Sequence, residues 1–102
     1  MNDRVFVLFF DAKMLTIVNR REYQRFLKEL KGNGYGILQK SVYIKNALND
    51  ARVVNEERRI REFTPSSIEI RLLLLSRNVF DSMININCDQ IRLAPNYSII
   101  SF

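Results

Sequence analysis

The residue of this sequence best suited to metal chemistry is Asp11. It follows six apolar residues, Val5 to Phe10, whose aromatic and β-branched side chains favour a covered strand. A carboxylate at the carboxyl end of a strand lies where loops commonly carry function, and it can hold Mg²⁺ with few other protein ligands. A turn residue or loop cap is the alternative, and one carboxylate does not separate the two.

Basic residues after this strand could bind phosphates. Most of them fall in a segment that has helical spacing, where they would occupy the exposed side of the helix. Such side chains contact phosphates without reading bases. The alternative is a solvated helix face that exchanges surface ion pairs of little energetic value. The candidates for nucleic-acid binding are Lys13, Arg20, Arg21, Arg25 and Arg77.

The composition favours a polyanionic partner and argues against several enzyme classes. The 16 Lys and Arg against 11 Asp and Glu give a formal charge of +5, which favours polyanions through counterion release, although ordinary surface solvation also produces such a balance. The chain has no histidine and one cysteine, Cys88. It therefore does not have the residues for an internal disulfide, a Cys/His zinc site or a catalytic Cys–His pair. Ser41 has no histidine to activate it, which argues against a hydrolase triad.

The size and hydropathy pattern indicate one domain. A chain of 102 residues can bury a single apolar core, so we expect one domain over residues 1–102. The apolar run near the N-terminus is too short for a membrane span and lacks the cleavage site of a secretion signal. We therefore expect a soluble, cytoplasmic protein without a membrane partner. The aromatic residues within apolar runs are expected to pack in the core rather than stack on bases; they are Phe6, Phe9, Phe10, Tyr35 and Tyr43.

The first half of the chain predicts a strand, a helix and a second strand. Residues 4–10 form the first strand, and residues 12–18 form a connection without helical polarity. A helix then begins with Asn19 as its N-cap and ends at Gly32-Asn33-Gly34, where glycine supplies left-handed backbone. Residues 35–45 alternate between apolar and polar types and predict the second strand.

The second half completes an α+β pattern. A helix is expected over residues 50–63, a strand over 67–75 and a helical turn over 78–83, before short β-prone pieces at 84–88, 91–94 and 97–102. A bend in the segment 35–46 would supply one more strand and complete a ferredoxin-like split βαβ sandwich. The last piece would be an additional C-terminal strand that pairs with the edge of a second protomer, giving a homodimer.

Four pieces of the sequence, in this order and spacing, resemble a known family. They are Phe9-Phe10-Asp11, Arg20-Arg21-Glu22-Tyr23-Gln24-Arg25-Phe26, Gly34-Tyr35 and Gln39-Lys40-Ser41-Val42-Tyr43. The family is the small CRISPR-associated adaptation protein, an endoribonuclease family that supplies the second Cas protein of the spacer-acquisition complex. Members from type II systems are the most similar. The resemblance runs through most of the chain and is weakest at its C-terminal end.

The resemblance implies both a fold and a function. It implies a ferredoxin-like homodimer that bridges dimers of a CRISPR integrase subunit while double-stranded DNA is captured as a new spacer. It also implies that Asp11, paired across the dimer axis, is the Mg²⁺ site and catalytic residue for phosphodiester hydrolysis. The sequence departs from the family after this residue, where Lys13-Met14-Leu15-Thr16 replaces a Pro-Thr-type turn and Asn19 replaces an acidic residue. We expect that loop to approach DNA differently.

Three functions remain open at this point. The first is a Mg²⁺-dependent nuclease, in which Asp11 of both protomers holds the metal and nearby basic residues stabilise the developing charge. The second is a DNA-binding scaffold without chemistry, which we favour because one carboxylate per chain is sparse for two-metal catalysis. The third is a toxin-like, metal-dependent endoribonuclease unrelated to spacer acquisition, whose partner would be single-stranded RNA.

Overall fold

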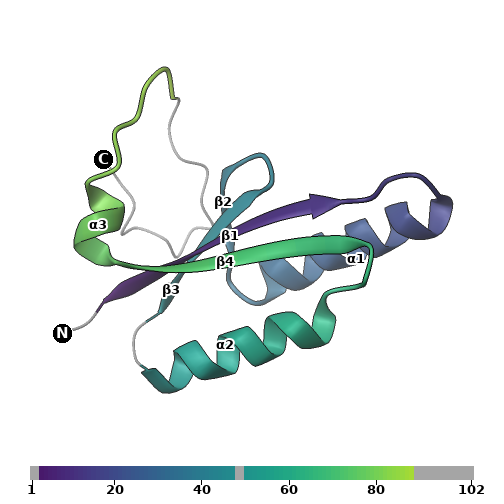
Figure 1. Ribbon diagram of the computed structural model, residues 1–102, viewed down its shortest axis with the longest axis horizontal. Helices are drawn as coiled ribbons and strands as arrows, with labels where there is room; N and C mark the ends of the chain where they lie inside the picture. The colour runs from purple at the N-terminus through teal and green to yellow at the C-terminus, as the bar shows by residue number, and fades with distance from the viewer. Residues whose placement is uncertain (1–2, 48–49, 89–102) are drawn as a thin grey trace.

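The computed structural model describes residues 3–47 and 50–88, and all structural statements below concern these residues. Strands and helices follow one another in the order expected of a split βαβ chain (Figure 1). The elements are β1 (Arg4–Ala12), α1 (Ile17–Gly32), β2 (Gly36–Gln39), β3 (Val42–Ala47), α2 (Asp50–Phe63), β4 (Ile68–Ser76) and α3 (Arg77–Asp81). No helix among the described residues is both long enough and apolar enough to cross a membrane.

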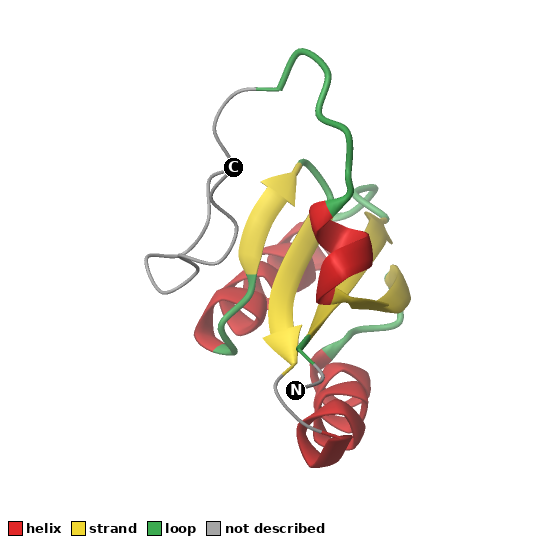
Figure 2. Ribbon diagram, turned by 90° about the vertical axis from the view of Figure 1, so that its left-hand side faces the viewer, coloured by secondary structure: helices red, strands yellow, loops and turns green. Residues whose placement is uncertain are grey.

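The four strands form one antiparallel sheet in the order β2-β3-β1-β4. Helices α1 and α2 cover one face of this sheet, while α3 lies at one end of the other face (Figures 1 and 2). This arrangement confirms the predicted α+β class and the ferredoxin-like sandwich. The expected additional C-terminal strand at 97–102, like the piece at 91–94, lies outside the described residues.

Alternate residues of β1 supply both faces of the sheet. Phe6, Leu8 and Phe10 point toward the helices, where the Phe10 ring meets Phe26 of α1 edge-on with ring centroids 5.3 Å apart. Each such buried side chain stabilises the fold by roughly 1.5–3 kcal/mol. The core under the helices is therefore aromatic and is centred on β1.

The start of α1 differs from the prediction. The helix begins at Ile17, and its N-cap is Thr16 rather than Asn19. Thr16 has the extended backbone that an N-cap requires, and its hydroxyl accepts a hydrogen bond from the backbone N–H of Asn19 at 3.0 Å. Asn19 thus occupies the third position of the helix, and the connection expected over residues 12–18 shrinks to the four residues 13–16.

The segment expected as one long strand at 35–45 is two strands joined by a tight turn. Ser41 takes a left-handed backbone conformation with φ of 64°, which reverses the chain between β2 and β3. The Ser41 carbonyl oxygen accepts a hydrogen bond from the Phe10 backbone N–H at 3.1 Å, so the turn is tied to β1. The bend considered for this segment is confirmed.

The face of the sheet opposite α1 and α2 is only partly covered. Phe80 of α3 packs there with Val5, Val7 and Ile44 in a second, smaller cluster. Phe9 lies on the same face beyond the reach of α3 and is 40% exposed, contrary to its predicted place in the core. Residues 84–88 follow α3 without forming the expected β piece. We call this side of the sheet, with Phe9 and Leu73 at its uncovered part, the open face.

A buried carboxylate connects α2 to the sheet. Glu56 accepts a hydrogen bond from the Tyr35 hydroxyl at 2.9 Å on one carboxylate oxygen and from Lys45 Nζ at 2.6 Å on the other. The Lys45 ammonium also lies 5.4 Å from the centre of the Tyr35 ring, a cation–π arrangement. A buried charge is stable only when it is paired in this way, so the three side chains act as one clamp.

We expect Glu56→Ala to lower the free energy of unfolding by about 2–4 kcal/mol, because it leaves the Lys45 ammonium and the Tyr35 hydroxyl without their acceptor. Urea denaturation followed by circular dichroism measures the change. The matched control is Glu57→Ala, the adjacent residue, whose exposed carboxylate only pairs with Arg61 at 3.2 Å. That control should cost about 0–1 kcal/mol. Equal losses from the two variants would contradict the clamp.

Candidate functional site

Asp11 lies at the far end of β1 from α3, on the open face, with its side chain exposed to solvent. Its partner across the sheet is Glu69 of β4, which is also exposed. Directly opposed residues of antiparallel strands have Cβ atoms about 4.5–5.5 Å apart, so the chain presents two neighbouring carboxylates at this place. Sequence reasoning missed Glu69, because only the pairing register of β1 and β4 brings it to Asp11.

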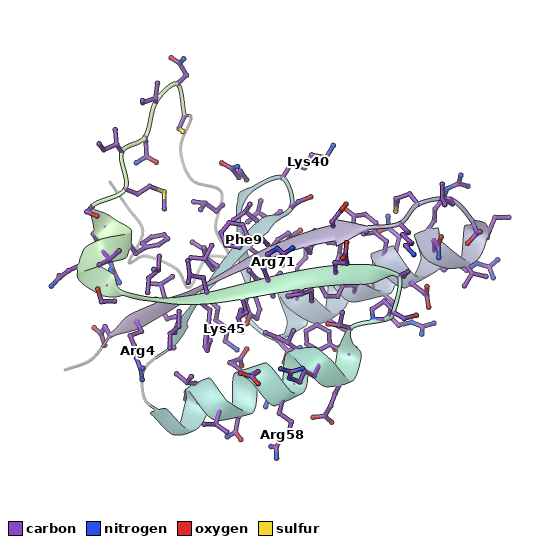
Figure 3. All side chains as sticks on the ribbon, viewed as in Figure 1. Arg4, Phe9, Lys40, Lys45, Arg58 and Arg71 are labelled. Atoms are coloured by element: carbon purple, nitrogen blue, oxygen red, sulfur yellow. The ribbon has the colours of Figure 1, made fainter. Side chains whose placement is uncertain are left out.

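The next pair along the same two strands is Phe9 and Arg71. Residues two apart on a strand share a face, so Arg71 lies beside Glu69 on the open face, and its side chain is exposed. Figure 3 labels Phe9 and Arg71 where β1 and β4 run alongside each other. The surroundings of Asp11 therefore hold a second carboxylate, one guanidinium and one exposed aromatic ring.

The oxygen donors at this place fit a hard cation only in part. Asp11 and Glu69 offer carboxylate oxygens of the kind that Mg²⁺ prefers. Among the described residues, however, no group of three or more His, Cys, Asp or Glu side chains comes together. Mg²⁺ usually keeps several waters and takes one or two carboxylates, so one chain supplies the minimum of such a site.

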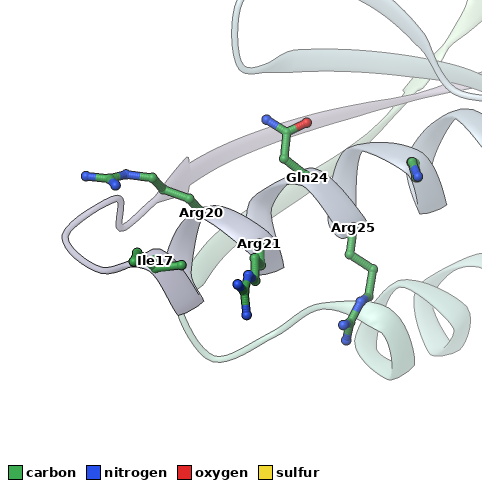
Figure 4. Close-up of a pocket in the computed structure, with 6 residues that line it drawn as sticks. Ile17, Arg20, Arg21, Gln24 and Arg25 are labelled. Carbon is green, nitrogen blue, oxygen red and sulfur yellow. The ribbon is translucent and has the colours of Figure 1, made fainter.

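A second cluster gathers cations on one exposed side of α1. Arg20, Arg21, Arg25 and Lys28 line a shallow groove of about 410 Å³ together with two uncharged side chains of the same helix. Figure 4 shows the labelled side chains of Arg20, Arg21 and Arg25 extending outward from α1. We call Arg20, Arg21, Arg25 and Lys28 the α1 cation face. Three of the residues predicted to bind nucleic acid, Arg20, Arg21 and Arg25, come together here. Lys28 joins them one helical turn further along α1.

The two long helices differ in how their charges are paired. Three arginines of α2 have a carboxylate of the same helix within reach: Arg61 is 3.2 Å from Glu57, Arg58 is 3.9 Å from Glu62, and Arg59 is 4.0 Å from Glu56. Within residues 3–47 and 50–88, none of the four residues of the α1 cation face makes an ion pair. Four cations without an ion pair to any described residue are therefore gathered on one side of α1.

One of the two acidic residues of α1, Glu22, is used elsewhere and does not neutralise the α1 cation face. Glu22 lies on α1 between these cations in sequence, but its carboxylate accepts a hydrogen bond from the Ser67 hydroxyl at 2.9 Å, at the start of β4. The side chain is half-buried at that contact. Glu22 therefore fixes α1 against the sheet instead of pairing with Arg25.

The remaining predicted residues lie apart from this cluster or at its edge. Arg77 is on α3, across the sheet from α1, and its Nε donates to the Asp81 carboxylate at 3.0 Å. The structure therefore does not bring Arg77 to the α1 cation face. Lys13 lies in the loop between β1 and α1, where its backbone N–H donates to the Ser67 carbonyl at 2.9 Å and its side chain is exposed.

Comparison with known proteins gives one consistent family. The family profile described as CRISPR associated protein Cas2 matches residues 4–83, a range that begins with β1 and ends just after α3. A protein of Ligilactobacillus salivarius strain UCC118 named CRISPR-associated endoribonuclease Cas2 is 31% identical over 77 residues, which is 76% of each chain. A protein of the same name from Streptococcus mutans serotype c strain NN2025 is 33% identical over 81 residues, covering 79% of this chain and 76% of the relative.

A solved structure gives the same result for the fold. Streptococcus pyogenes Cas2, crystallised at pH 6.5, superposes with a TM-score of 0.61 at 19% sequence identity. The superposition covers 81% of this chain and 99% of that chain. The resemblance read from the sequence motifs is therefore confirmed, and the matched residues stop before the C-terminal end, where the resemblance was expected to be weakest.

Proposed function

The chain belongs to the Cas2 family of CRISPR-associated proteins, and from this premise we propose that it serves spacer acquisition as a homodimeric scaffold. The dimer binds duplex DNA and bridges dimers of the integrase subunit. The observation that carries this proposal is the gathering of four cations on the α1 cation face, none of which makes an ion pair within the described part of the chain. A Mg²⁺-dependent phosphodiesterase activity at Asp11 is the second candidate, which the neighbouring Glu69 carboxylate favours.

The α1 cation face suits the backbone of a nucleic acid. Along a helix that rises 1.5 Å per residue, Arg21, Arg25 and Lys28 are spread over about 10 Å. Duplex DNA carries several phosphate charges over the same length. Because these cations make no ion pair with residues 3–47 or 50–88, binding a phosphate does not first require such a pair to break. The α2 arginines would have to give up Glu57 and Glu62, so α2 contributes less.

A second copy of the chain is the proposed occupant of the open face. Phe9 and Leu73 are 40% and 48% exposed there, which leaves apolar side chains in water on a face that α3 covers only at one end. Strand β4 is also at the edge of the sheet formed by the described residues, so its outer backbone groups can pair with a further strand. An isologous contact through this side would be self-complementary.

This dimer would also assemble the metal site. Asp11 and Glu69 lie on the same open face as Phe9, so two copies that meet there bring further carboxylates toward each other. The residues that would hold Mg²⁺ are Asp11 and Glu69 of both protomers. A bound Mg²⁺ supplies water of lowered pKa and shields phosphate charge. Arg71, which lies beside Glu69, would bind the phosphate oxygens.

We expect Arg21→Ala/Arg25→Ala to weaken duplex DNA binding at least tenfold, a loss of about 1.4 kcal/mol or more, because two phosphate contacts disappear. The slope of log K against log salt should fall by about 2 units. Fluorescence anisotropy with a labelled duplex at several salt concentrations measures both quantities.

The matched control removes the same charge from the other helix. Arg58→Ala/Arg61→Ala deletes two arginines that already pair with Glu62 and Glu57. Its affinity for DNA should remain within about threefold of the wild type, a change of less than about 1 kcal/mol. If both double variants lose affinity equally, DNA binding follows from net charge and not from the α1 cation face.

We expect Asp11→Ala to retain duplex binding and to support integration of a spacer by the integrase subunit at the wild-type rate, because a scaffold needs no hydrolytic chemistry. Any Mg²⁺-dependent cleavage of RNA or DNA by the wild type should disappear in this variant. The measurements are an integration assay on a plasmid carrying a repeat and a gel-based cleavage assay with and without Mg²⁺. Loss of integration with retained DNA binding would instead establish the phosphodiesterase as the essential activity.

We expect Leu73→Asp to convert the protein to a monomer, because it places an unpaired charge in the apolar contact proposed for the open face. Light scattering after size-exclusion chromatography measures the mass. Val54→Asp is the matched control, since Val54 is an exposed apolar residue of α2 on the other side of the sheet. A dimeric Leu73→Asp would contradict dimerisation through the open face.

A further inference from the structure

We propose that Leu15, at the tip of the loop between β1 and α1, is an apolar wedge that inserts between base pairs of the bound duplex and bends it. This inference rests on the proposed binding of DNA to the α1 cation face. Within the described residues, Leu15 is 84% exposed, and three neighbouring apolar side chains are exposed with it. They are Met14, Ile17 and Val18.

The exposed apolar side chains lie within the basic surface. Ile17 is 63% exposed and lines the same groove as Arg20, Arg21, Arg25 and Lys28 (Figure 4). Lys13 precedes the apolar residues, and no acidic residue occurs between Asp11 and Glu22. A ligand of this surface must therefore carry negative charge and must also present apolar groups to these side chains.

Duplex DNA fits this requirement better than an acidic protein segment. Its phosphates match a row of cations that continues along α1 for more than two turns beyond the loop. Its stacked bases supply the apolar contact, because proteins that bend DNA insert Leu, Ile or Met side chains from the minor groove between base steps. The minor groove is about 6 Å wide, which admits a single loop tip but not a helix.

The loop is built to hold a side chain rigidly. It has only four residues, 13–16, between the end of β1 and the start of α1. At one end the Lys13 backbone N–H is bonded to the Ser67 carbonyl at 2.9 Å, and at the other Thr16 caps α1 through its side chain. A wedge must resist the cost of unstacking, which is a few kcal/mol per base step, so a short loop fixed at both ends is suited to the task.

The experiment measures the shape of the duplex as well as its affinity. The full-length protein is titrated into a DNA duplex that carries a donor and an acceptor dye at its ends, and into a set of duplexes with 2-aminopurine at successive positions. For the wild type we expect a rise in energy transfer from bending and a rise in 2-aminopurine fluorescence from unstacking. For Leu15→Ala we expect both signals to fall to those of free DNA at saturating protein, while the dissociation constant stays within about tenfold.

Two variants make the comparison specific. Leu15→Met keeps a wedge of similar volume and should retain both signals. Ile84→Ala removes an equally exposed side chain, 83% exposed, from the segment after α3, and it should leave both signals unchanged. If the Leu15→Ala variant bends the duplex as much as the wild type does, the inference is overturned.

The failure of the wedge and the failure of DNA binding give different results. If the wild type binds the duplex in the salt-dependent manner expected of the α1 cation face but leaves it straight and stacked, the wedge alone is overturned. If the wild type does not bind the duplex, the proposed scaffold function is overturned together with the wedge. A Leu15→Ala protein that binds a straight, stacked duplex supports the inference.

Discussion

The alternation of side chains along β1 is the constraint on which the rest of the structure depends. β1 is paired on both sides, with β3 and with β4, so neither a shift in register nor a rotation of the strand is available to it. Its even-numbered residues from Phe6 to Phe10 must then face the helices, and its odd-numbered residues from Val5 to Asp11 must face the other way. Asp11 is on the open face for this reason alone, and a shift by one residue would bury it under α1.

The sequence contains enough information to predict the architecture but not the exposure of each face. The apolar run of β1, the glycines at the end of α1 and the alternation before Ala47 predicted the order of elements, because each is a local signal. Phe9 was predicted in the core, since an uninterrupted apolar run does not reveal which of its faces a helix will cover. The neighbour of Asp11 was missed for a related reason. Glu69 is 58 positions away in the chain, and only the β1–β4 register joins the two.

Local competition explains where α1 begins and where the segment 35–45 divides into two strands. Thr16 and Asn19 are both suitable N-cap residues. Thr16 is the N-cap because its hydroxyl accepts a hydrogen bond from the Asn19 N–H, and because Ile17 and Val18 can adopt helical backbone angles while their side chains are exposed to solvent. Ser41 ends β2 because a tight antiparallel turn needs a residue with positive φ, which the polar alternation of residues 35–45 does not show. Both outcomes place functional residues. The first shortens the loop that carries Leu15, and the second ties the turn to β1 beside the end that carries Asp11.

The distribution of charge pairs is a better guide to function than net charge. α2 has four basic and four acidic residues, and two of its arginines, Arg58 and Arg61, pair with Glu62 and Glu57 one helical turn away. α1 has five basic and two acidic residues, and one of those two, Glu22, is held by Ser67. The positive charge of the chain, +5 in total, is therefore distributed unevenly. Much of it lies on α1, the helix that follows the loop after Asp11.

If the open face joins two copies, the two Asp11 side chains approach the dimer axis. The two α1 cation faces then remain on the outer side of each sheet, available to DNA. Metal binding and dimerisation would then be linked, because an ion bound by carboxylates of both copies stabilises the dimer as much as the dimer stabilises the site. DNA binding by α1 needs neither, since its cations all belong to one helix of one chain.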